Sequence, residues 1–186
     1  MENSIYSTAG NYENLIVYQK AEAIFDITCY FCQTYLRRGD RTIDQMVQAA
    51  RSGKQNIIEG SAASVTSRET EIKLTNVAKA SSLELLADYK DYLRTRGHRQ
   101  WEDNSIELKA MRKIGRKHND SAFYMNIVKT RPPETIANMA ICMIKQNDYL
   151  LHLLLKTLEK QFLTEGGLRE RMFRMRQQER GKKSGK

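Results

Sequence analysis

The segment from Gln45 to Leu93 constrains the fold more than any other part of the chain. It contains two stretches with helical periodicity, joined by the small-residue turn Ser61-Ala62-Ala63-Ser64. In the first stretch, apolar or small residues recur at steps of three and four and form one stripe, at Ile43, Met46, Val47, Ala50, Gly53 and Ile57. Because the side chains on this face are small, we expect the backbone of a neighbouring helix to approach closely. These features specify a helical bundle, and by themselves they specify no chemistry.

Local signals predict where the two helices end and begin. Gly60 follows the last periodic residues of the first helix, so we expect it to end that helix as a left-handed cap. Thr66 and Glu69 have capping-box spacing and predict the start of the second helix. This second helix carries two apolar rows, one at Val77, Ser81, Leu85 and Tyr89 and the other at Ile72, Leu83, Leu86 and Leu93. A helix that is apolar on two sides contacts more than one neighbour, so we expect a homo-oligomer.

The same periodicity predicts two further long helices. The first runs from Tyr12 to about Leu36, and Gly39 closes it. The last runs from about Arg131 to about Leu163, with the adjacent Pro132 and Pro133 in its first turn, where a missing N–H is not needed. We therefore expect four long helices in all.

The region between the third and last long helices predicts one short helix, from the apolar positions Ile106, Leu108, Met111 and Ile114. The chain has few runs of Val or Thr, the residues that favour strands, which argues against a β-sheet. The predicted fold class is therefore all-α: an up-down four-helix bundle with an extra short helix between helices 3 and 4 and a basic C-terminal tail. The length suits one bundle domain over residues 1–165, followed by the tail over residues 166–186.

The positive charge of the chain is unevenly distributed. The net charge is +9. Residues 1–93 hold 10 Lys and Arg against 12 Asp and Glu, whereas residues 94–186 hold 21 against 10. A nearly neutral half joined to a strongly basic half predicts a polyanionic partner for the second half.

Two basic clusters in the second half are the candidate nucleic-acid-binding sites. They comprise Lys109, Arg112, Lys113, Arg116 and Lys117 at helical spacing, and Arg169, Arg171, Arg174, Arg176, Lys182 and Lys183 in the tail. Trp101 and Phe173 are available for stacking on bases. We expect the tail to order only on contact, because it has few apolar residues to bury. The alternative is that the tail only improves solubility, and RNA and DNA both remain open as ligands.

Other candidate chemistry has a structural interpretation. The Cys29-x-x-Cys32 pair lies in the middle of a helix among aromatic residues and without a second Cys or His pair, so we predict core packing. Asn56 and Glu59 lie one turn apart, and Ser81 and Glu84 lie on the next helix. In an enzyme such a group could provide an acid–base pair, but no activated nucleophile or phosphate loop accompanies it. We interpret these four residues as a structural polar network, and we predict no cofactor, no small-molecule substrate and no enzymatic activity.

The chain carries no signal for membrane insertion or export. No stretch approaches the roughly 20 uncharged apolar residues of a membrane span. The N-terminal residues lack the basic-then-apolar pattern of a signal peptide. We therefore predict no membrane partner, a cytoplasmic location and reduced cysteines.

Several quoted segments resemble one known family. The opening NYENLIVYQKAEAIFDIT, the helix QMVQAARSGKQNIIEG and the later ASSLELL are similar to the four-helix bundle family of 23S ribosomal RNA intervening-sequence proteins and the accessory variability determinant of diversity-generating retroelements. The resemblance covers roughly residues 11–95, and Ala50-Arg51-Ser52-Gly53 departs from the usual pattern. The segments TRPPETIANMAICMIKQNDYLL and GGLRERMFRMR look like the C-terminal extension of a subset of that family.

The resemblance implies more than the residues alone. It implies assembly into rings, commonly pentamers. It also implies a role as an accessory factor that binds a reverse transcriptase and its template RNA. The alternative within the family is a free-standing interaction scaffold of the intervening-sequence type, without a reverse transcriptase partner.

Overall fold

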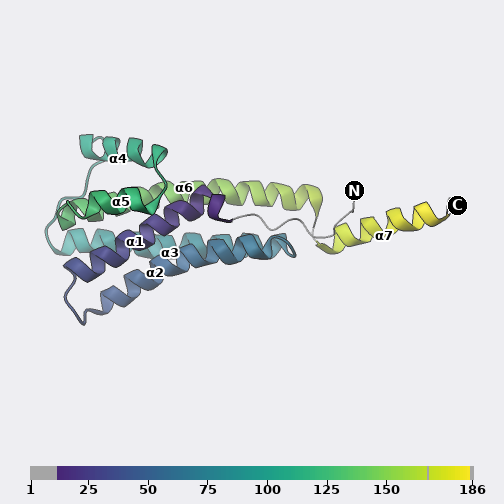
Figure 1. Ribbon diagram of the computed structural model, residues 1–186, viewed down its shortest axis with the longest axis horizontal. Coiled ribbons are helices and arrows are strands. Elements are labelled where there is room, and N and C mark those ends of the chain that lie inside the picture. The colour runs from purple at the N-terminus through teal and green to yellow at the C-terminus, as the bar shows by residue number, and fades with distance from the viewer. Residues whose placement is uncertain (1–11, 167, 185–186) are drawn as a thin grey trace.

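The chain is helical throughout the part that the structure describes, which is residues 12–166 and 168–184 of a computed structural model (Figure 1). A short 3-10 turn at Tyr12–Asn14 precedes seven α-helices in these residues. The helices are α1 Ile16–Tyr35, α2 Arg41–Ala63, α3 Arg68–Thr95, α4 Ile106–Lys117, α5 Ser121–Val128, α6 Pro133–Glu165 and α7 Leu168–Ser184. No strand occurs in this part of the chain, which confirms the prediction of an all-α fold.

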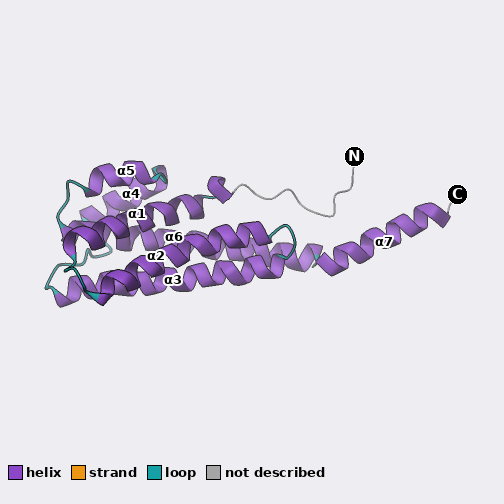
Figure 2. Ribbon diagram, turned by 60° about the horizontal axis from the view of Figure 1, so that its bottom comes forward, coloured by secondary structure: helices purple, strands orange, loops and turns teal. Residues whose placement is uncertain are grey.

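The long helices α1, α2, α3 and α6 pack against one another in alternating directions (Figures 1 and 2). Helix α2 packs along α3, α3 packs along α6, and α1 contacts both α2 and α6. Helix α4 lies on α6, and α5 lies on α1. In the described chain, no helix is long and apolar enough to cross a membrane.

The connection between α3 and α6 contains two short helices, where the sequence predicted one. The second is α5, which begins after Asp120, whose carboxylate accepts a hydrogen bond from the Phe123 amide at 2.8 Å. An apolar run of this length can be a strand or a helix, and the aspartate cap favours the helix. The prediction of a single short helix was therefore wrong.

The aromatic core joins α1 to α3. The Phe31 ring lies 5.2 Å from the ring of Tyr89 and 4.7 Å from that of Tyr92, measured between centroids. Tyr89 is fully buried, and its hydroxyl donates to Thr28 Oγ1 at 3.1 Å. Thr28 in turn donates to the Ile24 carbonyl at 2.7 Å, so both buried hydroxyls are paired.

Two glycines let α2 approach α3 closely. A Cβ atom at Gly53 would lie 3.4 Å from Ser82 Oγ, and one at Gly60 would lie 3.4 Å from the Cβ of Leu74. Gly60 has a right-handed helical backbone, and α2 continues past it to Ala63. The prediction that Gly60 ends this helix as a left-handed cap was therefore wrong, because the residue provides space for α3 instead.

The start and the buried face of α3 also differ in detail from the prediction. Ser67, not Thr66, caps the helix by accepting a hydrogen bond from the Thr70 amide at 3.2 Å. Ala78 is fully buried, whereas Val77 is 45 % exposed. Val77 therefore lies outside the buried row in which the sequence placed it.

Helix α7 extends from the end of α6 and projects beyond the bundle (Figures 1 and 2). The sequence predicted that this segment orders only on contact with a ligand, and the structure differs. Its Arg, Gln, Met, Glu and Lys residues all have high helix propensity, which favours a helix without a buried face. Gly166, with φ of 72°, separates α7 from α6.

A pair of substitutions at Gly53 tests the close approach of α2 to α3. Gly53→Leu should lower the free energy of unfolding by about 1–3 kcal/mol, because its branches would enter space held by Ser82 and Ala78. Gly53→Ala should leave it unchanged or raise it by up to about 1 kcal/mol, because a single Cβ fits and alanine favours helices. Chemical denaturation checks both, and equal midpoints for the two variants would show that Gly53 does not face α3.

Candidate nucleic-acid interface

Helix α4 places five basic residues on one face. Ser105 caps the helix by accepting a hydrogen bond from the Leu108 amide at 3.2 Å. Leu108, Met111 and Gly115 form the buried side. At 3.6 residues per turn, the basic residues span an arc of about 140° on the other side. This basic face of α4 comprises Lys109, Arg112, Lys113, Arg116 and Lys117.

Four of these five cations are exposed and form no ion pair among the described residues: Lys109, Lys113, Arg116 and Lys117. Arg112 is half-buried, and its guanidinium pairs with the Asp103 carboxylate at 2.7 Å. Glu107, the acid in the first turn, pairs with Arg99 outside the helix. Because four of its five cations have no ion-pair partner among the described residues, the face keeps a positive field.

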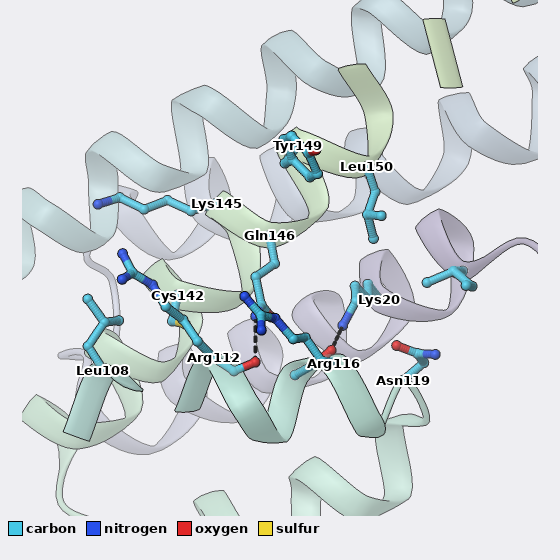
Figure 3. A pocket seen from close by; sticks show the side chains of 12 residues that line it. Lys20, Leu108, Arg112, Arg116, Asn119, Cys142, Lys145, Gln146, Tyr149 and Leu150 are labelled. Atoms are coloured by element: carbon cyan, nitrogen blue, oxygen red, sulfur yellow. Dashed lines mark hydrogen bonds between the residues drawn. The ribbon is translucent and has the colours of Figure 1, made fainter. Parts of the chain in front are cut away.

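A buried lysine holds the C-terminal half of α4 against α1. Lys20 is only 3 % exposed, and its ammonium donates to the Gly115 carbonyl (Figure 3). That carbonyl lies in the last turn of α4, where helix carbonyls lack partners and a cation is favourable. Burial lowers the pKa of Lys20 below its ordinary value. Lys20 therefore acts as a cap for α4 supplied by another helix.

A glutamine holds the same helix against α6. Gln146 Nε2 donates to the Arg112 carbonyl at 3.0 Å. A Cβ atom at Gly115 would lie 2.0 Å from Gln146 Oε1, so the contact requires a glycine or a displaced glutamine. Sequence analysis missed both anchors. The one available signal was Lys20 itself, which falls at helical spacing between Ile16 and Ile24 on an apolar face.

Asn138 fixes the loop that leads into α4. This residue of α6 is 2 % exposed. Its side-chain oxygen accepts from the Trp101 amide at 2.7 Å, and its Nδ2 donates to the Arg99 carbonyl at 2.9 Å. Trp101 is half-buried against the core rather than free to stack on bases. The predicted role of Trp101 in base stacking therefore has no support from its position.

The basic residues of α7 form a second, separate group. Arg174 and Arg176 are exposed, and Phe173 is 63 % exposed. The side chains of four further candidates lie outside the described part of the chain: Arg169, Arg171, Lys182 and Lys183. Helix α4 and helix α7 occupy opposite ends of the molecule (Figures 1 and 2). One chain therefore does not bring the two predicted clusters together.

Two of the four predicted polar-network residues, Asn56 and Ser81, are linked between α2 and α3 through Ser52. Asn56 Nδ2 donates to the Ser52 carbonyl at 2.9 Å, and the Ser52 and Ser81 hydroxyls lie 2.9 Å apart. Glu59 and Glu84 are exposed and lie outside this group. The group thus contains an amide and two hydroxyls, without a carboxylate to act as acid or base.

The cysteines lie in or against the core. Cys32 and Cys142 are buried, and burial raises the pKa of their thiols to about 12 and about 11. Both are therefore neutral thiols near pH 7, which are poor nucleophiles and poor metal ligands. No group of three or more His, Cys, Asp or Glu in the described residues is placed to hold a metal ion.

Comparison of the chain with protein-family models, with curated proteins and with solved structures finds no match.

Proposed function

We propose that this protein is a non-enzymatic helical-bundle protein that self-associates and binds RNA or DNA through the basic face of α4. The observation that carries the proposal is the row of four exposed cations on α4 without ion-pair partners among the described residues. A solvated face normally mixes both signs of charge, whereas a polyanion-binding face concentrates one. Helix α7 adds a second basic segment, 17 residues long, at the far end of the molecule.

The way α4 is held also supports this role. Lys20, Gln146 and Gly115 fix its inner side to α1 and α6, so its outer side is presented rigidly. A rigid row of cations binds phosphates with less loss of side-chain and backbone entropy than a flexible tail. We expect α4 to supply the affinity, and α7 to extend the contact to a second stretch of the same nucleic acid or to another molecule.

The biological setting that we propose is the one implied by the family resemblance. In it, the protein is an accessory factor of a diversity-generating retroelement and binds the reverse transcriptase and template RNA. The support for this setting is the resemblance over residues 11–95. The second candidate is an interaction scaffold of the intervening-sequence type. A reverse transcriptase gene with template and variable repeats beside this gene would favour the first candidate.

Charge reversal on α4 tests the interface. The wild-type protein should bind structured RNA with a log–log salt slope of about −3 to −5, which corresponds to four to six neutralised phosphates. Lys113→Glu with Lys117→Glu should reduce the magnitude of that slope by at least about 1.5, because two phosphate contacts disappear. The measurement is fluorescence anisotropy over a series of salt concentrations, with circular dichroism as a check on folding.

The matched control is Lys156→Glu with Lys160→Glu. These exposed lysines of α6 have the same four-residue spacing and give the same change in net charge. The control should change the slope much less. Equal losses in the two double variants would show that binding depends on overall charge and not on the α4 face.

The proposed self-association has its own test. Leu83 is 47 % exposed and lies on the side of α3 away from the buried row, and Leu153 of α6 is 41 % exposed. Light scattering should give a mass above the 21.6 kDa of one chain at micromolar concentration. Leu83→Glu should lower that mass while preserving helicity, because it places a charge in the contact. A wild-type mass of one chain at every concentration would contradict the proposal.

A further inference from the structure

A cleft opens beside the basic face of α4, between α4, α1 and α6 (Figure 3). Its volume is about 480 Å³, which is within the range of pockets that hold small organic molecules. Such a volume admits a nucleobase with its sugar. Neither the sequence signals nor the α4 face by itself points to this cleft, because its walls come from three helices that are far apart in the chain.

One part of the cleft wall is apolar. Leu108 of α4 and Cys142, Leu150 and Tyr149 of α6 contribute to it. Tyr149 is 61 % exposed. An exposed tyrosine ring beside an apolar hollow is the arrangement on which unpaired bases stack in single-strand-binding proteins. The wall therefore suits a flat, partly apolar ring.

The rest of the lining is cationic. Lys20, Arg112, Arg116 and Lys145 line the cleft, and no Asp or Glu does. Three of these cations, Arg112, Lys145 and Lys20, lie close enough to Cys142 to act electrostatically on its thiol. Arg112 is paired with Asp103, whereas Arg116 and Lys145 form no ion pair among the described residues. A purely apolar ligand would leave these two charges without a counter-charge, so the cleft suits a ligand that combines a ring with an anion.

The N–H donors of the Lys20 ammonium, which lines the cleft, support the same conclusion. The ammonium has three N–H donors, and one of them is used by the Gly115 carbonyl. The other two have no acceptor among the described residues. A buried ammonium with unused donors favours a ligand that brings acceptor oxygens. Base carbonyls and phosphates both supply such oxygens.

The cleft is continuous with the basic face of α4. Arg112 and Arg116 belong to both, since they lie on the face and also line the cleft. A phosphate backbone that follows the face would therefore pass the mouth of the cleft. A double helix keeps its bases stacked inside, whereas a single strand can turn one base outward.

We propose that the cleft receives one unstacked nucleotide of a single-stranded nucleic acid, with the base against Tyr149 and the apolar wall and a neighbouring phosphate on Arg116 and Lys145. This inference rests on the proposed function and deepens it. The α4 face supplies sequence-independent affinity, and the cleft adds a preference for unpaired strands.

The test uses full-length protein and three labelled RNA probes of equal length: a single strand, the same strand with abasic sites, and a duplex. Anisotropy should show that the single strand binds at least about tenfold more tightly than the abasic strand, since stacking contributes about 1–3 kcal/mol per base. Tyr149→Ala should remove that difference, and Tyr149→Phe should retain it, because phenylalanine keeps the ring. The control is Leu163→Ala, an exposed apolar residue of the same helix outside the cleft, which should leave all three affinities unchanged.

The outcomes separate the two proposals. Equal binding of all three probes, unaffected by Tyr149→Ala, would overturn the cleft as a nucleotide site while leaving the α4 interface in place. No binding of any probe at low salt would overturn the proposed function itself. If Tyr149→Ala instead changed the mass in light scattering and not the RNA affinity, a second copy of the chain would occupy the cleft, and the nucleotide proposal would be wrong.

Discussion

The hydrogen bond from the buried ammonium of Lys20 to the Gly115 carbonyl is the contact on which the orientation of the basic face of α4 depends. It joins residues 95 positions apart and pairs the Gly115 carbonyl, one of the carbonyls in the last turn of α4 that have no partner within the helix. Because this end and the glycine beside it face inward, the lysines and arginines of α4 must face outward. The position of one buried cation thus helps to determine where the basic residues of α4 lie.

Core packing and positive charge are concentrated in different halves of the chain. Helices α2 and α3 meet through Gly53 and Gly60, and the aromatic cluster around Tyr89 ties α1 to α3, in a half of the chain that is almost neutral. The second half supplies α6, which completes the bundle, and the basic helices α4 and α7 at its two ends. A neutral half favours compact packing and self-association, whereas concentrated positive charge would oppose both. The separation lets one small protein combine a stable core with a strongly basic surface.

The sequence predicts well what depends on local periodicity and less well what depends on distant contacts. The four long helices follow from apolar residues at steps of three and four, and Gly39 lies where a helix break was expected. Gly60 shows the limit of local signals, because a glycine suits both a left-handed cap and a close helix contact, and only the position of α3 decides. The cap of α3 was predicted at Thr66 and lies at Ser67, because the adjacent hydroxyl residues give the same local signal.

Two of the anchors of the candidate site could not be predicted from spacing. Gln146 and Asn138 contact partners 34 and 37 residues away, and nothing in their neighbourhood distinguishes them from other polar residues of a long helix. The basic residues of α4 were found because charge on one helix face is a local pattern. The cleft beside them was not found, because it exists only after α1, α4 and α6 come together.

The central claim is that the α4 face is the main nucleic-acid contact. Hydrogen–deuterium exchange of the full-length protein, read by mass spectrometry with and without single-stranded RNA, tests it most directly. RNA should slow amide exchange in residues 106–117 and in the facing part of α6 around Gln146, while α2 and most of α3 remain unchanged. Slowed exchange confined to α7, with residues 106–117 exchanging as in the free protein, would contradict the claim and assign binding to the C-terminal helix instead.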